Sequence, residues 1–148
     1  MNRVIIGVDP DAQKHGVAVY RNKQLRELST LTLVDIMKKI VAPAVEDESI
    51  ELFFAIEDVC ANTFIYSRNM KKNLSLQSRV ARNVGACQQS QVELMRFLDD
   101  LKISYALYKP TSGNWAKNKK RFELLTGWNQ RSNEDTRSAA YFGYLAAR

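Results

Sequence analysis

The sequence is poor in the residues that build disulfide frameworks and zinc sites. It contains two cysteines, Cys60 and Cys87, and a single histidine, His15. Two cysteines without metal-site spacing exclude a disulfide scaffold and favour a reducing compartment. We expect Cys87 to be a core residue, because it falls on an apolar helical stripe, and His15, at the start of a strand, to be structural. The scarcity of both residue types also disfavours zinc catalysis.

Long apolar segments are absent as well. No run reaches the roughly 18 apolar residues of a membrane span, and no signal peptide is visible. We therefore expect a cytoplasmic protein, of a bacterial or phage-infected cell, with no membrane partner. A length of 148 residues predicts a single domain, 1–148, that is large enough to bury a core.

Acidic residues are outnumbered by basic ones. Lys and Arg total 22 against 16 Asp and Glu, which gives a net charge of +6 and a pI near 9.4. This balance fits a merely basic soluble protein, and it fits equally a partner that is a polyanion such as nucleic acid. The basic residues form three groups, namely Arg68, Lys71 and Lys72; Arg79 and Arg82; and Lys117, Lys119, Lys120 and Arg121.

Hydrophobic periodicity predicts the order of the elements. Residues 3–9 and 51–57 are continuous apolar runs, as in strands buried on both faces. Shorter strands are expected at 16–20, 25–32 and 103–108, the first two in an antiparallel meander with 3–9. Helices are expected at 33–41, ended by Pro43; at 75–101; at 119–125, closed by Gly127; and from Asn133, as the cap, to the end. This order predicts an α/β protein of the RNase H-like fold, a mixed five-stranded sheet with helices on both faces.

Two carboxylates stand where the two buried strands end. Asp9 has a structural explanation, because Asp-Pro-Asp is good turn chemistry. Glu57 has no such explanation. If the two strands are adjacent and parallel, the two acids face each other, and their repulsion and burial call for a cation. An all-oxygen donor set without Cys or His suits Mg²⁺ or Mn²⁺.

A third acid, Asp135, lies in the first turn of the final helix. Acids are common there because the helix dipole favours them. A functional part for Asp135 requires that this helix begin beside Asp9 and Glu57, which the RNase H-like arrangement would achieve.

Five segments resemble, in order and spacing, the motifs of RuvC-like Holliday-junction resolvases, and the resemblance covers nearly the whole chain. They are VIIGVDPD at 4–11 with GVA at 16–18, AIEDV at 55–59, the loop and long helix from 73 to 86, residues 105–111, and DTRSAA at 135–140. One departure is clear. The last family motif is Asp-x-x-Asp-Ala-Leu, and its second Asp is replaced by Ser138. Glu134 or Asp11 could compensate, or the metal is bound less tightly through the Ser138 hydroxyl.

The resemblance implies a homodimeric endonuclease that cleaves four-way DNA junctions. Asp9, Glu57 and Asp135 would hold two Mg²⁺ (or Mn²⁺) ions about 4 Å apart, one activating a water and the other stabilising the leaving 3′ oxygen. A two-fold dimer would nick two strands symmetrically, with the helix at 75–101 as its interface. Two alternatives stay open: another RNase H-like nuclease, acting on flaps or RNA–DNA hybrids, and a non-catalytic junction-binding module.

The basic groups and two aromatics are candidate DNA contacts. A solvated charged face is the ordinary explanation of the basic groups, but beside a carboxylate cluster they suit phosphate contact. Phe64 and Tyr66 follow the second acidic strand, where they either pack or stack on bases at the junction. Trp115 and Trp128 are expected to be packing residues.

Overall fold

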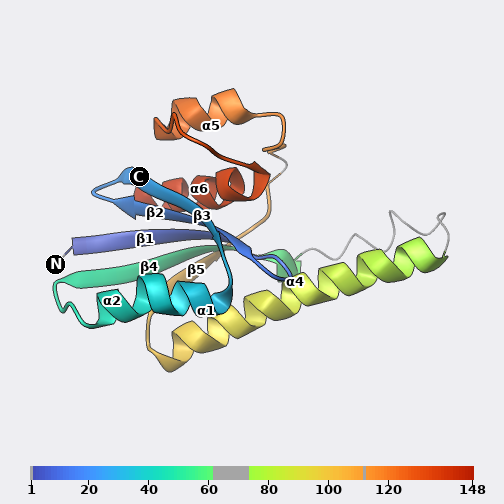
Figure 1. The fold of residues 1–148 in the computed structure, drawn as a ribbon, viewed down its shortest axis with the longest axis horizontal. Coiled ribbons are helices and arrows are strands. Elements are labelled where there is room, and N and C mark those ends of the chain that lie inside the picture. The colour runs from blue at the N-terminus through green and yellow to red at the C-terminus, as the bar shows by residue number, and fades with distance from the viewer. Residues whose placement is uncertain (1, 62–73, 112) are drawn as a thin grey trace.

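The computed structural model describes residues 2–61, 74–111 and 113–148, and its centre is a five-stranded mixed sheet (Figure 1). The strand order is β3-β2-β1-β4-β5. The strands are β1 (Asn2–Asp9), β2 (His15–Arg21), β3 (Gln24–Leu31), β4 (Ile50–Glu57) and β5 (Ser104–Tyr108). The first three strands form the predicted meander, because each connection between them is a short polar turn.

The two buried apolar runs are neighbours at the centre of the sheet. β1 pairs in parallel with β4, and Val8 lies opposite Ile56, so that the following residues, Asp9 and Glu57, end the two strands at the same edge. On its other side β1 pairs antiparallel with β2, and Asp9 lies opposite Gly16. The parallel arrangement on which the sequence argument depended is therefore confirmed.

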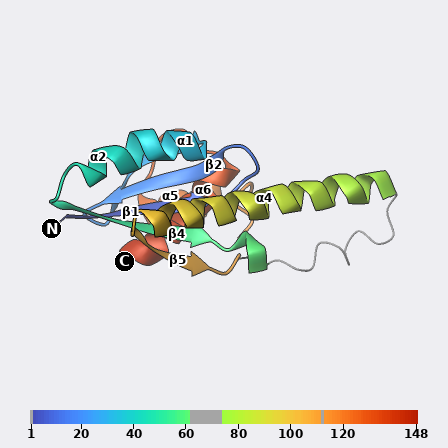
Figure 2. The same cartoon turned by 90° about the horizontal axis from the view of Figure 1, so that it is seen from below.

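Helices cover both faces of this sheet (Figures 1 and 2). One face carries α1 (Leu33–Ile36), a π-helical turn η1 (Met37–Val41), α2 (Ala42–Val45) and the C-terminal half of α4 (Leu74–Asp100). The other face carries α6 (Glu134–Ala147), with α5 (Lys119–Thr126) packed on α6. A short 3₁₀ turn, η2 (Val59–Ala61), follows β4. The predicted fold class is confirmed.

Alternation along β1 divides the core into two layers. Val4, Ile6 and Val8 face α1, α2 and α4, whereas Ile5 faces α6. Gly7 allows α6 to approach closely, because a Cβ there would lie 2.0 Å from the carbonyl oxygen of Ala139. Small residues on the facing side of α6, Ala139 and Gly143, complete this close approach of the helix backbone to the sheet.

The prediction that Pro43 ends the first helix was wrong. Helical structure continues through α2, with Pro43 near its start. The turn before it, η1, widens to a π-helix, in which the Ala42 amide donates to the Met37 carbonyl. Proline lacks an amide hydrogen and its ring crowds the carbonyl four residues back, and a locally widened turn accommodates both.

The long helix α4 begins beyond the end of the sheet. Its buried side chains, Gln91, Leu94 and Leu98, all lie in its C-terminal part. Its N-terminal half projects past the rest of the molecule (Figures 1 and 2). The prediction of Cys87 as a core residue was therefore wrong: Cys87 is half-buried, and its thiol donates to Asp11 Oδ1 at 3.4 Å. An apolar stripe is buried only as far as the sheet reaches.

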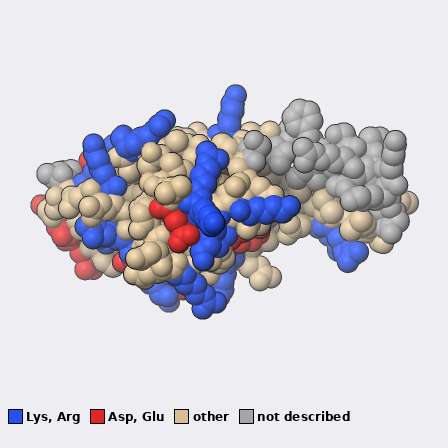
Figure 3. Space-filling model, turned by 90° about the horizontal axis from the view of Figure 1, so that it is seen from above, with Lys and Arg blue, Asp and Glu red and all other residues tan. Residues whose placement is uncertain are grey.

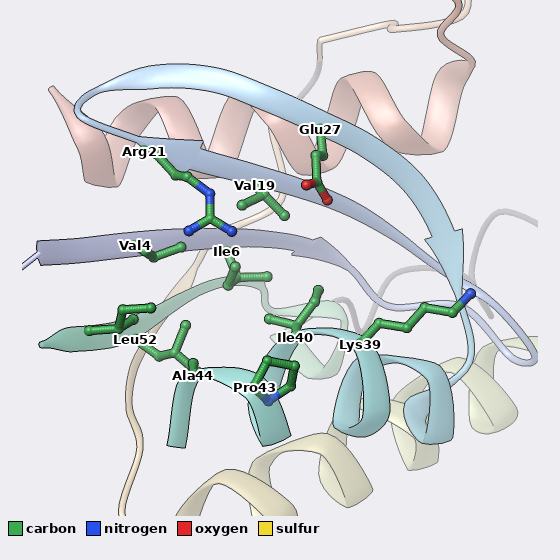
Figure 4. Close-up of a pocket in the computed structure, with 11 residues that line it drawn as sticks. Val4, Ile6, Val19, Arg21, Glu27, Lys39, Ile40, Pro43, Ala44 and Leu52 are labelled. Atoms are coloured by element: carbon green, nitrogen blue, oxygen red, sulfur yellow. The ribbon is translucent and has the colours of Figure 1, made fainter. Parts of the chain in front are cut away.

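A small cavity lies between the sheet and the η1–α2 segment (Figure 4). Its volume is about 110 Å³, and its floor is formed by apolar side chains such as Val4, Ile6 and Leu52. Neither Asp9 nor Glu57 lines the cavity, so it is separate from the edge at which β1 and β4 end. Within the described residues, no helix combines the length and the apolar character needed to cross a membrane.

Candidate active site

Asp9 and Glu57 meet at the carboxyl edge of the central strands. Both are half-buried, and their side chains are hydrogen-bonded to one another. Burial, followed by the negative charge of Glu57 and its hydrogen bond, raises the pKa of Asp9 to about 9. Burial also raises the pKa of Glu57, with a further contribution from Asp135. At neutral pH the pair therefore retains a proton, which the two carboxyls share.

Asp135 reaches the same edge because α6 starts there. Asn133 caps the helix by accepting from the Thr136 amide at 2.9 Å, and Thr136 reciprocates by accepting from the Asn133 amide at 2.9 Å. Gly16, opposite Asp9 in the sheet, gives room for this start, because a Cβ there would lie 2.3 Å from the Asp135 carbonyl oxygen. Burial and then the charges of Asp11 and Glu134 raise the pKa of Asp135.

Ser138 stands one helical turn after Asp135, on the same face of α6. Its hydroxyl donates to Glu57 Oε2 at 3.4 Å and is also a hydrogen-bond partner of Asp9. It is buried, at 8% exposure. Ser138 thus brings an uncharged hydroxyl to the Asp9–Glu57 pair. Of the two acids that could compensate for the missing carboxylate, Glu134 is exposed and Asp11 is half-buried.

The chemistry of this donor set fits a hard divalent cation. Asp9, Glu57 and Asp135 supply only oxygen, and in the described part of the chain the one ion pair joins Arg96 to Glu93, so no Lys or Arg neutralises the three acids. Buried carboxylates without a counter-ion are unfavourable unless they bind protons or a cation. Among the described residues, however, no three Asp, Glu, His or Cys side chains already stand in an arrangement that could hold a metal ion.

The predicted basic residues divide into three sets. Lys117, Lys119 and Lys120 are exposed at the start of α5, which lies on the side of α6 away from the sheet (Figure 1), and the face that carries α5 shows many Lys and Arg side chains (Figure 3). Arg79 and Arg82 are exposed on the projecting half of α4. The predicted contacts Phe64, Tyr66, Arg68, Lys71 and Lys72 lie outside the described residues.

Arg121 differs from the neighbouring lysines, because it packs on aromatic rings. Its guanidinium lies 5.4 Å from the ring centre of Trp115 and 5.9 Å from that of Tyr141. Trp115 is buried at 4% exposure, and Trp128 packs against the same cluster, as predicted for both. Arg121 therefore stabilises the packing of α5 on α6, and its side chain remains partly exposed on the face that carries α5.

Two residues that support the site were missed in the sequence, and the structure shows how a third, Asp11, is held. Arg137 is buried and donates to the Trp115 carbonyl at 2.8 Å and to Ser132, which anchors the start of α6. Gln91 of α4 accepts from the Val59 amide at 2.7 Å and donates to Asp58, so it holds the chain just after Glu57. Asp11 contacts α4 through Cys87. The only sign of Arg137 and Gln91 in the sequence is that each is a polar residue on an otherwise apolar face of its helix.

His15 is structural, as expected. It is buried at 3% exposure, and its Nδ1 accepts from the Asp11 amide at 3.2 Å. Burial lowers the pKa of its imidazole, so it remains neutral at physiological pH.

The chain was compared with protein-family models, with curated proteins and with solved structures, and only solved structures match. No protein-family model and no curated protein matches the sequence. The structure of T. thermophilus RuvC in complex with a Holliday junction substrate matches with a TM-score of 0.56 and 14% identity, over 97% of this chain and 93% of that one. A further Thermus thermophilus RuvC structure matches with a TM-score of 0.48 and 15% identity, over the same shares of the two chains. At such identity the likeness is one of fold: this chain has an RNase H-like fold, as T. thermophilus RuvC does.

Proposed function

We propose that this protein is a metal-dependent endonuclease that cleaves branched DNA, and in particular a Holliday-junction resolvase. The observation that carries the proposal is the pair Asp9–Glu57, which is half-buried, hydrogen-bonded and without a cationic partner among the described residues, with Asp135 brought to the same edge by α6. A fold shared with a protein solved on a Holliday junction supports the choice of substrate. The domain would comprise residues 1–148.

In this proposal Asp9, Glu57 and Asp135 hold two Mg²⁺ or Mn²⁺ ions, which supply the activation of water and the stabilisation of the leaving oxygen. The exposed lysines at the start of α5 and the arginines of α4 would contact DNA phosphates, and a homodimer would cut two strands. These lysines lie at the start of α5, which packs on α6, the helix that carries Asp135.

One observation favours a second candidate, a junction-binding module without catalysis. Ser138 occupies the place of a fourth acid, and its hydroxyl contacts both Asp9 and Glu57 without adding charge. Such a site would bind metal more weakly, although DNA binding by the basic surface would persist.

A nicking assay on a mobile four-way junction with Mg²⁺ or Mn²⁺ separates the candidates. We expect the wild-type protein to nick the junction, and Asp9→Asn and Glu57→Gln each to reduce the rate at least about 1,000-fold while leaving junction affinity within about threefold. Asp58→Asn serves as control, because Asp58 is a neighbouring half-buried acid that bonds to Gln91. Cleavage by Asp9→Asn at the wild-type rate would refute the active site. Binding without nicking would identify the module, and preferential cleavage of a flap or an RNA–DNA hybrid would identify another RNase H-like nuclease.

A further inference from the structure

A groove lies between strand β3 and the segment that leads from α5 into α6. Its volume is about 490 Å³. The residues that line it are Leu28, Ser29, Thr30, Arg131, Ser132, Asn133 and Thr136. Most of them carry a hydroxyl, an amide or a guanidinium, and none is an acid. The groove therefore has the lining of a site for an anion.

The segment before α6 presents side-chain donors to this groove. Ser132 Oγ accepts from Arg137 Nε at 2.9 Å, so the proton of its hydroxyl remains available to an acceptor. Asn133 Oδ1 accepts from the Thr136 amide at 2.9 Å, which leaves the amide NH₂ of Asn133 as a donor. Among the described residues neither donor has an acceptor, and the exposed guanidinium of Arg131 has no ion-pair partner.

Arg137 adds a buried positive charge directly behind this segment. It is buried at 9% exposure, and its guanidinium donates to the Trp115 carbonyl at 2.8 Å and to the hydroxyl and carbonyl of Ser132 at 2.9 and 3.2 Å. These acceptors are all neutral, and no carboxylate in the described part of the chain forms an ion pair with Arg137. A buried cation without a counter-ion is unfavourable. An anion bound in the groove against Ser132 would supply one.

The groove lies beside the edge of the sheet that carries the three acids. Thr30 pairs with Gly16 in the sheet, and Gly16 pairs with Asp9, so two strand spacings, or about 10 Å, separate Thr30 from Asp9. On the helix side, Asp135 follows Asn133 by two residues. With a rise of about 3.4 Å per nucleotide, 10 Å corresponds to about three steps along a duplex strand.

We propose that this groove binds a phosphate of the DNA strand that is cut, within about three nucleotides of the cleaved linkage. This inference rests on the proposed function. Arg131, Thr30 and the Ser132 hydroxyl contact the phosphate oxygens, and Arg137 is a positioning residue that orients Ser132 and supplies charge from behind it. Such contacts carry no base information, so the groove fixes the position of the strand relative to the acids.

Neutralising single phosphates tests this assignment without using cleavage. Uncharged methylphosphonate linkages are placed one at a time along each strand of a four-way junction, and the Kd of the full-length protein is measured by fluorescence anisotropy in EDTA. We expect one linkage, or two adjacent ones, to cost wild type about tenfold in affinity and Arg131→Gln less than about twofold, because the variant has already lost that contact. On the unmodified junction Arg131→Gln should bind about tenfold more weakly, and Thr30→Val about threefold.

Arg26→Gln is the matched control. Arg26 is also an exposed arginine, on β3, but it does not line the groove, so this variant should keep the affinity of wild type and its response to every neutral linkage. If wild type and Arg131→Gln lose the same affinity at every neutral linkage, the groove holds no phosphate and the inference is wrong. Should Arg131→Gln melt well below wild type, Thr30→Val decides the question by the same comparison, because valine keeps the branched shape of threonine in the strand.

The outcomes also separate this inference from the proposed function. A protein that nicks junctions but shows no coupling between Arg131 and any phosphate would overturn the inference alone. A protein that shows the coupling but nicks no junction would keep the phosphate site and overturn the proposed catalysis. Absence of any affinity for DNA would overturn both.

Discussion

At the scale of single residues, the chemistry of the site is a competition between a proton and a cation for the same oxygens. Asp9 and Glu57 are placed together by two adjacent strands, and without a cation one shared proton relieves their repulsion. Burial disfavours the ionised form of both. A divalent ion would relieve the same repulsion more completely, so metal affinity should rise as the proton is released.

The raised pKa of Asp9 predicts how the stability of the metal-free protein depends on pH. The pKa rises from 3.8 in the ordinary carboxyl to about 9 in the folded chain, so the folded protein binds this proton more tightly than the unfolded chain does. The free energy of unfolding therefore falls as pH rises from about 4 towards 9. In Asp9→Asn this loss is absent.

Urea denaturation in EDTA at pH 5 and pH 8.5 measures the effect. We expect Asp9→Asn to exceed wild type in free energy of unfolding at both values, and the difference to grow by roughly 4 kcal/mol at the higher pH. If the difference in free energy of unfolding between Asp9→Asn and wild type is the same at both pH values, Asp9 is not protonated in the folded protein.

At the scale of elements, the site depends on how closely α6 lies on the sheet. Gly7 and Gly16 provide the room, the first under Ala139 and the second under Asp135. Because the atoms that a Cβ would meet belong to the helix backbone, they cannot move without moving the helix. The register of α6 on the sheet therefore sets the distance between Asp135 and the Asp9–Glu57 pair.

Gly16→Ala tests this dependence. Its Cβ would meet the Asp135 carbonyl, so we expect the variant to lose about 2 kcal/mol of stability and to bind Mn²⁺ at least about tenfold more weakly. Gly85→Ala is the matched control, because a Cβ added to Gly85 on α4 would meet nothing within 4 Å; it should gain about 0.5 kcal/mol and bind Mn²⁺ normally. Urea denaturation and Mn²⁺ titration measure both, and normal metal binding by Gly16→Ala would contradict the argument.

The segment at the start of α5 should carry much of the DNA affinity. Each phosphate contact by a lysine releases condensed counter-ions and adds about 0.9 to the slope of log K against log salt. Replacing Lys117, Lys119 and Lys120 with Gln should therefore flatten that slope by about two to three. The same loss of charge on η1 and β3, by replacing Arg26, Lys38 and Lys39, should leave the slope nearly unchanged. Equal slopes for the two triple variants would exclude α5 from the DNA-binding surface.

At the scale of the whole molecule, the projecting half of α4 gives the protein an elongated shape (Figure 2). Its stripe of Val80, Val84 and Cys87 is half-buried, and Leu74 is exposed at 79%. The sheet does not reach this part of the helix, where Val80 and Val84 are half-buried and Cys87 already contacts Asp11. This supports the prediction that α4 forms the interface of a homodimer that cuts two strands together.

Val84→Glu should dissociate that dimer, because it would place a charge in the apolar interface. Asn83→Asp is the control, since it adds the same charge at the adjacent exposed position. Sedimentation velocity should show a monomer for Val84→Glu at concentrations at which wild type and Asn83→Asp are dimers. On a supercoiled plasmid with an extruded cruciform, Val84→Glu should yield single nicks where wild type linearises the DNA. A dimer of unchanged affinity in Val84→Glu would place the interface elsewhere.

Much of this protein is determined locally, and that part can be predicted from the sequence. Continuous apolar runs that stop at Asp9 and Glu57 predict two central strands, and the capping residues Asn133 and Gly127 predict where helices begin and end, because each depends only on near neighbours in the chain. The order of these elements is sufficient for the fold class and for the meeting of Asp9 with Glu57.

What only the tertiary structure decided depends on residues that are distant in the sequence. The helix α4 extends beyond the end of the sheet. The thiol of Cys87 therefore contacts Asp11 in the β1–β2 loop, although the apolar stripe to which Cys87 belongs is buried in the core further along the helix. The exposure of Glu134 and the contact of Ser138 with Glu57 follow in the same way from the packing of α6 over Gly7 and Gly16. Periodicity shows which face of a helix is apolar, but how far along the helix that face is covered depends on where its partner ends.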